Sequence, residues 1–128
     1  MNYILLLDDE QHWLDNFTRA TEAVLPEPKT EWQILTAQNG DELLRLLDDK
    51  QKETKLIISD LNLREGYAWD VLEKIRTQYP HIKLLLSTRT SAQYLDQEAY
   101  NRCKIDSYLN KYDFEEKLLD TLVELGII

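Results

Sequence analysis

The chain has 128 residues, of which 43% are hydrophobic, and this size and composition predict one domain, residues 1–128, with a single buried core. Its 24 acidic and 15 basic side chains give a formal net charge of -9, which argues against direct binding to nucleic acid or to an anionic membrane surface. The single cysteine cannot form an internal disulfide, the two histidines lie too far apart for a zinc site, and the opening apolar run is too short for a signal peptide or a membrane span. We therefore expect a cytoplasmic protein.

Apolar runs of strand length alternate along the chain with segments of helical period. The runs lie at residues 3–7, 32–35, 56–59, 82–87 and 107–109. Several of them are apolar at every position, which is typical of strands buried on both faces of a parallel sheet. The first, third and fourth runs are therefore predicted to form the centre of the sheet.

The segments between these runs carry helix signals. Two rows of residues, each spaced to share one helical face, are Trp13, Phe17, Ala20 and Val24, and Ala68, Leu72, Ile75 and Tyr79. Helix-capping pairs are predicted at Asn39 with Glu42 and at Asp113 with Glu116. The segment 91–101 is weaker, with only Ala92, Leu95 and Ala99 to bury. The alternation predicts an α/β fold of five βα units around an open, doubly wound parallel sheet.

Polar side chains collect where the predicted strands end, and ligands of such sheets bind beyond the carboxyl ends of the strands. They are Asp8, Asp9 and Glu10 after the first strand, Asp60 after the third, Ser87, Thr88 and Arg89 after the fourth, and Lys111 after the fifth. Carboxylates packed together repel one another unless a cation neutralises them, and all-oxygen ligands favour a hard ion such as Mg²⁺. Because Mg²⁺ commonly takes phosphate oxygens as further ligands, the pattern predicts a site that handles phosphate.

The acids divide into a nucleophile and metal ligands. An aspartate can itself accept a phosphoryl group and form an acyl phosphate, and Asp60 is the candidate nucleophile. Asp9 would bind Mg²⁺ directly, and Asp8 directly or through water. Asp60 and the backbone carbonyl of Asn62 would complete the protein ligands.

The remaining polar residues would bind the phosphoryl oxygens. Lys111 would neutralise one oxygen, and the Thr88 hydroxyl would donate a hydrogen bond to another. Neighbouring residues of a strand point to opposite faces, so a register slip of one residue would give this role to Ser87. Glu10 is interpreted as a charge that favours the start of the following helix.

Four motifs in chain order, LLLDDE, IISDLNL, LLLST and YLNK, each coincide with the end of a predicted strand. Together they resemble a response-regulator receiver domain, of the kind found in chemotaxis receivers, over essentially the whole chain. The resemblance implies a flavodoxin-like sheet of strand order 2-1-3-4-5 and Mg²⁺-dependent phosphorylation by a histidine kinase or a histidine phosphotransfer protein. It implies a signalling switch that accepts the phosphoryl group on itself and slowly loses it, rather than a turnover enzyme.

The resemblance also implies how the signal would leave the domain. Tyr108 would be the switch aromatic, which turns inward when Thr88 moves toward the phosphoryl group. The surface of the fourth helix, the fifth strand and the fifth helix would then bind a downstream protein. The predicted last helix ends close to the C-terminus, so we expect no output domain in this chain.

Several positions depart from the usual pattern of the family. Arg64 and Tyr112 stand where proline is usual, Arg89 stands where a small residue is usual, and Lys104 with Ile105 replaces a Gly-Ala pair before the last strand. These departures keep open an alternative function, a receiver-fold binding module that is poorly or not phosphorylated.

Arg89 has two alternative orientations in this reading. As a candidate gate, its long side chain would lie across the mouth of the cleft and slow access to Asp60; otherwise it would point away and pair with surface acids. A third functional class, a Mg²⁺ phosphatase or flavin-binding protein on a similar sheet, is disfavoured. The acids Asp8 and Asp9 are adjacent, and no loop rich in hydroxyls and glycine follows the first strand.

Overall fold

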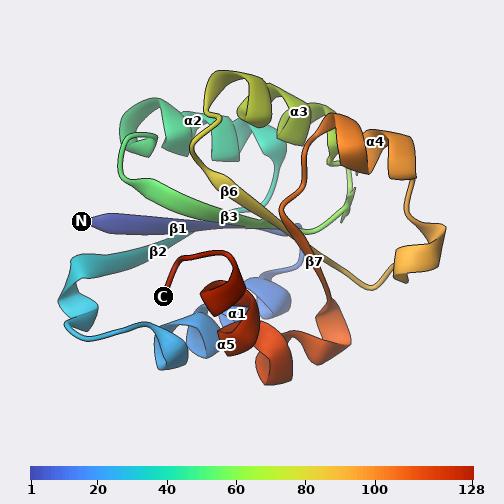
Figure 1. Ribbon diagram of the computed structural model, residues 1–128. Coiled ribbons are helices and arrows are strands. Elements are labelled where there is room, and N and C mark those ends of the chain that lie inside the picture. The colour runs from blue at the N-terminus through green and yellow to red at the C-terminus, as the bar shows by residue number, and fades with distance from the viewer.

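The centre of the molecule is a five-stranded sheet, seen in the computed structural model of the whole chain, residues 1–128 (Figure 1). In spatial order its strands are β2 (Trp32–Ala37), β1 (Asn2–Leu7), β3 (Thr54–Ser59), β6 (Lys83–Thr88) and β7 (Ser107–Asn110). All neighbouring pairs are parallel. The five predicted strands are confirmed, and so are the order 2-1-3-4-5 and the central place of the first, third and fourth apolar runs.

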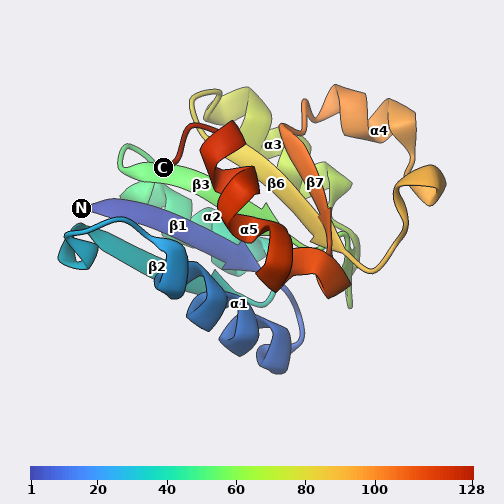
Figure 2. The same ribbon diagram turned by 60° about the horizontal axis from the view of Figure 1, so that its bottom comes forward.

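Helices cover both faces of the sheet (Figure 1). One face carries α2 (Gly40–Lys50), α3 (Trp69–Gln78) and α4 (Gln97–Arg102), and the other carries α1 (Gln11–Val24) and α5 (Phe114–Glu124). Short 3-10 turns are η1 (Lys29–Glu31), η2 (Ala92–Tyr94) and η3 (Lys111–Asp113). Figure 2 shows α1 and α5 lying beside each other in front of the sheet. None of the helices is both long and apolar enough to cross a membrane.

Alternate residues of each central strand supply two separate cores. On β1, Leu5 and Leu7 join the core under α2, α3 and α4, while Ile4 and Leu6 join the core under α1 and α5. This is the pleat expected of a strand whose two faces are both covered, and it explains why the run is apolar throughout. Both cores fix the ends of the central strands in place.

The predicted face of α1 needed one correction. The fully buried row is Leu14, Phe17 and Thr21, whereas Trp13 is only half-buried at the edge of the core. The reason is that α1 packs against α5 as well as against the sheet, which widens its apolar face beyond one row. Trp13 lies near the 3-10 turn η3, which precedes α5, and the centroid of its ring is 6.5 Å from that of Tyr112.

Two further expectations were partly wrong. Asn39 caps α2 by accepting a hydrogen bond from the Glu42 amide, as predicted, but Asp113 makes no such bond at α5. The side chain of Asn110 instead accepts from the Tyr112 amide, because a 3-10 turn precedes the helix. In the weak segment 91–101, Leu95 and Ala99 are buried while Ala92 is exposed, and α4 is correspondingly short.

Candidate functional site

Backbone hydrogen bonds at the carboxyl edge of the sheet fix the acids that follow β1 and β3. The Asp60 amide donates to the Leu7 carbonyl at 2.8 Å, and the Asp8 amide donates to the Ala37 carbonyl at 3.1 Å. Each residue therefore extends its strand by one more ladder bond before the chain turns away. This places the carboxylates of neighbouring strands side by side.

Three carboxylates and one ammonium meet at this edge. Oxygens of Asp8, Asp9 and Asp60 lie within 4.8 Å of one another. The ammonium of Lys111, at the end of β7, donates a hydrogen bond to Asp60 Oδ2 at 3.0 Å and lies 2.6 Å from Asp8 Oδ2. The side chain of Lys111 is 1% exposed, so the pair with Asp60 is shielded from water. The sequence prediction that these four residues meet therefore agrees with the geometry.

The cluster has an excess of negative charge. Burial raises the pKa of Asp8 above its usual value of 3.8, because the loss of solvation outweighs the nearby Lys111 ammonium. Asp8 Oδ1 accepts a hydrogen bond from the Glu10 amide, but the buried Oδ2 has no partner with hydrogen-bond geometry. An orphaned oxygen within an all-carboxylate group fits a hard divalent cation, and Mg²⁺ suits both the ligand type and the charge.

Thr88 faces this cluster from the end of β6. It is fully buried, and its Oγ1 lies 3.5 Å from Asn62 Nδ2 and 3.4 Å from the Thr90 amide, both long contacts. Ser87 is also fully buried, and its hydroxyl has no hydrogen-bond partner. Because Thr88 contacts the loop that follows β3, its hydroxyl faces the cleft, which favours Thr88 over Ser87 as the site hydroxyl.

A small hairpin follows Asp60 that sequence reasoning missed. The two-residue strands β4 (Asn62–Leu63) and β5 (Gly66–Tyr67) pair antiparallel, and Arg64 lies in the turn between them. Glu65 Oε1 from the same turn accepts a hydrogen bond from the Gly40 amide at 2.8 Å, which ties the hairpin to the start of α2. The turn therefore keeps its place without the proline that is usual there.

Two arginines lie at the mouth of the cleft. Arg64 Nε is 3.9 Å from Asp9 Oδ2, and Arg89 Nη2 is 3.6 Å from Glu10 Oε1. The Arg64 side chain is 87% exposed and that of Arg89 is 54% exposed, so both are weak surface pairs. Arg89 pairs with Glu10, a partly exposed acid that follows β1, and a gating role for its side chain stays a prediction.

Tyr108 lies at the periphery of the site. Its ring is half-buried, and its hydroxyl donates a hydrogen bond to the Thr90 carbonyl at 2.6 Å. The same hydroxyl accepts from Asn110 Nδ2 at 3.3 Å. Tyr108 is therefore coupled to the loop that follows Thr88, the last residue of β6.

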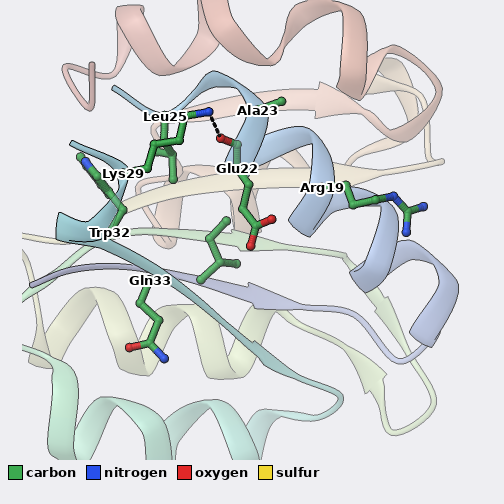
Figure 3. Close-up of a pocket in the computed structure, with 8 residues that line it drawn as sticks. Arg19, Glu22, Ala23, Leu25, Lys29, Trp32 and Gln33 are labelled. Carbon is green, nitrogen blue, oxygen red and sulfur yellow. Dashed lines mark hydrogen bonds between the residues drawn. The ribbon is translucent and has the colours of Figure 1, made fainter. Parts of the chain in front are cut away.

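The largest cavity lies away from these residues. It has a volume of about 720 Å³ and lies between the second half of α1, the loop that follows it and the start of β2 (Figure 3). Lys29 Nζ donates a hydrogen bond across it to the Glu22 carbonyl at 3.0 Å, while Arg19 extends away (Figure 3). The lining mixes charges of both signs with apolar groups, and no cluster of catalytic or metal-binding side chains points into it.

Comparison with known proteins agrees with the motifs and the fold. Residues 4–123 match the response regulator receiver domain. The signal receiver domain of an HD domain-containing protein from Pseudomonas fluorescens Pf-5 is 27% identical, with a TM-score of 0.81 over 97% of this chain and 85% of that chain. A response regulator receiver domain protein from Clostridium thermocellum is 22% identical, with a TM-score of 0.81 over 98% of this chain and 94% of that chain.

A third structure, chemotaxis response regulator CheY4 of Vibrio cholerae, is 21% identical, with a TM-score of 0.79 over 98% of both chains. No curated protein matches the sequence.

Proposed function

The chain belongs to the response regulator receiver domain family, and we propose that it is a two-component signalling switch in which Asp60 accepts a phosphoryl group. The donor would be a histidine kinase or a histidine phosphotransfer protein in the cytoplasm. One observation carries the proposal above all: Asp60, 7% exposed, lies beside two further carboxylates and is hydrogen-bonded to a buried ammonium. An aspartate with only a structural role would be destabilised by further carboxylates beside it, so the grouping favours a functional role.

In this mechanism one carboxylate oxygen of Asp60 attacks phosphorus. The new oxygen–phosphorus bond forms as the donor's bond to phosphorus breaks, and the leaving group keeps that electron pair. Lys111 would stay protonated and bind one phosphoryl oxygen, and the Thr88 hydroxyl would donate to another. Neither residue transfers a proton, so their contribution is charge and position.

Asp8, Asp9, Asp60 and the backbone carbonyl of Asn62 would hold Mg²⁺. When bound, the ion would supply positive charge to the phosphoryl oxygens and neutralise the carboxylates. The three acids of the cluster are otherwise balanced by Lys111 and by a weak, exposed pair with Arg64, which leaves an excess of negative charge against an incoming phosphate.

Phosphorylation would change the loop between β6 and α4. If Thr88 turns toward the phosphoryl group, its contacts with Asn62 and the Thr90 amide break and the loop shifts. Tyr108 would then lose its bond to the Thr90 carbonyl and be free to turn inward. A downstream protein would read the change on the surface of α4, β7 and α5; with a net charge of -9, nucleic acid and membrane are not expected as direct partners.

The mass of the intact protein after incubation with acetyl phosphate and Mg²⁺ tests the proposal. We expect the wild type and Asp41→Asn, an exposed acid outside the site, to gain one phosphoryl group. Asp60→Asn should gain none. A phosphoryl group that persists in Asp60→Asn would show that another residue is the acceptor.

A second candidate function, a binding module with little phosphorylation, is favoured by the arginines at the cleft mouth. Arg64 places a guanidinium group near Asp9, where it would compete with a metal ion for that carboxylate, and Arg89 pairs with Glu10 at the same cleft mouth. The same measurement separates the two functions. Wild-type protein that takes no phosphoryl group, from acetyl phosphate or from a phosphorylated histidine phosphotransfer protein, supports the binding module.

A further inference from the structure

The surroundings of Lys111 include an aromatic ring. Its Nζ lies 4.9 Å from the centroid of the Trp13 ring, over the face of the indole. The other close groups are Asp60 Oδ2 at 3.0 Å and Asp8 Oδ2 at 2.6 Å. An ammonium has three N–H donors; one is hydrogen-bonded to Asp60, and Asp8 is close enough for an ion pair. The indole face lies over a cation that is almost wholly removed from water.

The tryptophan carries a cost that a simpler apolar residue would not have. Its Nε1 is buried and has no hydrogen-bond partner. A buried, unpaired N–H loses its hydration without compensation, so phenylalanine or leucine at this position of α1 would avoid a penalty. What tryptophan offers in return is the most electron-rich aromatic face, the best partner for a cation among the side chains. The unpaired N–H thus indicates that the ring face is the useful part of Trp13.

Packing fixes the orientation of this ring. The ring centroids of Trp13 and Phe17 are 5.4 Å apart, and Phe17 stacks on Phe114 with centroids 4.0 Å apart. Tyr112, which directly follows Lys111, meets Trp13 edge-on at 6.5 Å. The row joins α1 to the start of α5, the two helices that lie side by side in Figure 2. Trp13 is therefore held over the ammonium by its neighbours.

We propose that Trp13 is a positioning residue for phosphoryl transfer, acting through Lys111. The inference rests on the proposed function. The indole face keeps water from Nζ and holds the ammonium at Asp60 while the oxygen–phosphorus bond forms and the donor's bond to phosphorus breaks. Trp13 touches no reacting atom and exchanges no proton or electron; it fixes where the charge of Lys111 lies.

A matched pair of substitutions separates the ring face from simple packing. Trp13→Phe and Trp13→Leu both remove the indole N–H and both leave an apolar side chain, but only phenylalanine keeps an aromatic face. We expect the rate of labelling by acetyl phosphate with Mg²⁺ to fall about threefold in Trp13→Phe and about tenfold to thirtyfold in Trp13→Leu. A packing role alone predicts rates that follow the stability of the two variants, which unfolding curves measure. Equal rates in the wild type and Trp13→Leu would overturn the proposal.

Fluorinated tryptophan at position 13 provides a variant that hardly changes shape. Each fluorine withdraws electron density and weakens the attraction of the ring for a cation. We expect the labelling rate to decline in steps from tryptophan to 5-fluorotryptophan to 5,7-difluorotryptophan. Unchanged rates along this series would contradict a role for the ring face, whatever happens in the leucine variant.

Fluorescence tests the contact without any phosphorylation. In a Trp32→Phe, Trp69→Phe background, Trp13 is the only indole. Replacing Lys111 with methionine should change its emission, whereas the matched change Lys117→Met, on the exposed side of α5, should not. If Lys111→Met leaves the emission unchanged, the contact does not exist and the proposal fails.

The two readouts distinguish failure of this inference from failure of the proposed function. Wild-type protein that labels normally, together with a Trp13→Leu variant that labels equally well, refutes the positioning role alone. Wild-type protein that takes no label refutes the switch, and the positioning role with it, even where Lys111→Met changes the emission.

Discussion

The two ends of the sheet both hold ion-paired side chains, but the partners of these charges differ. At the amino end, Arg76 of α3 is 12% exposed and forms an ion pair of 2.8 Å with Asp106. Its guanidinium also donates to backbone carbonyls, those of Pro80, Ile82, Cys103 and Lys104. Asp106 in turn accepts from the Leu84 amide at 2.8 Å. Arg76 and Asp106 therefore both have several partners within the chain.

At the carboxyl end, Asp8 and Asp60 share one ammonium, Asp9 has only a weak pair with the exposed Arg64, and the buried Oδ2 of Asp8 has no hydrogen-bond partner. The difference separates two uses of paired charge. The saturated Arg76 group joins α3 to β6 and to the loop before β7, and it stabilises the fold. The acidic group is held together by that same fold, and its unbalanced carboxylates fit the metal ion of the proposed function.

The amino end also explains one departure from the family pattern. Lys104 stands where glycine is usual and has a φ of 50°, a left-handed conformation that disfavours residues with a side chain. Its carbonyl accepts a hydrogen bond of 3.0 Å from Arg76 Nη2. Glycine would adopt this left-handed conformation without strain. With lysine at this position, the hydrogen bond from Arg76 stabilises the turn.

Arg76→Ala should cause the largest effect, a loss of about 2–4 kcal/mol in the free energy of unfolding, because it removes the ion pair with Asp106 and leaves the partly buried carbonyls of Ile82 and Cys103 without their donor. Denaturant unfolding measures this loss. Arg102→Ala, which breaks an exposed pair with Glu73, is the control and should cost less than about 1 kcal/mol. Where Arg76→Ala is still folded, its labelling rate should match the wild type. Equal losses in the two variants would mean that the amino end is no more stabilising than the surface.

Asp9→Ala should have the opposite effect: it should abolish labelling without reducing the free energy of unfolding. Loss of a direct ligand should weaken Mg²⁺ binding by at least about a hundredfold, roughly 2.7 kcal/mol, and abolish labelling. The free energy of unfolding should stay the same or rise, because repulsion from Asp8 and Asp60 is relieved. Calorimetric titration with Mg²⁺ and denaturant unfolding measure the two quantities, with Asp41→Ala as the control. An unchanged Mg²⁺ affinity would remove Asp9 from the metal site.

The sequence predicted the carboxyl end far better than the amino end, for a physical reason. Asp8, Asp60 and Lys111 each follow an apolar run, and parallel strands bring their carboxyl ends together, so adjacency in space follows from position in the pattern. Arg76 lies in the last turn of a helix, where a basic residue is ordinary, and its partners come from segments far along the chain. Nothing local distinguishes it from a surface arginine.

The sequence also did not predict what individual side chains contact. The spacing placed Trp13 on an apolar helical face, but a tryptophan that covers a cation has the same spacing as one that only packs. The hairpin after Asp60 has two residues in each strand, too few for an alternating pattern to reveal it.

Arg89 is a basic side chain at the mouth of the acidic, carboxyl end of the sheet. It follows β6, and its partner Glu10 follows β1, while β3 with Asp60 lies between these two strands. An ion pair between Arg89 and Glu10 therefore joins the ends of the two strands that flank β3, and we expect it to cross the approach to Asp60. Both an incoming small donor and the water that hydrolyses an acyl phosphate need an in-line approach to Asp60. A side chain in that path should slow both.

Arg89→Ala should consequently raise the rates of acetyl phosphate labelling and of dephosphorylation, each about tenfold if the obstruction adds about 1.4 kcal/mol to the barrier. Glu10→Gln is the matched control, because it breaks the ion pair while keeping the guanidinium. If the bridge is the obstruction, both variants become faster, and the glutamine variant by less because the side chain can still lie in the path. If Arg89 instead attracts the anionic donor, alanine slows labelling, whereas glutamine, which frees the guanidinium, speeds it. Unchanged rates in both variants would mean that a weak, exposed pair 3.6 Å long leaves the approach to Asp60 open.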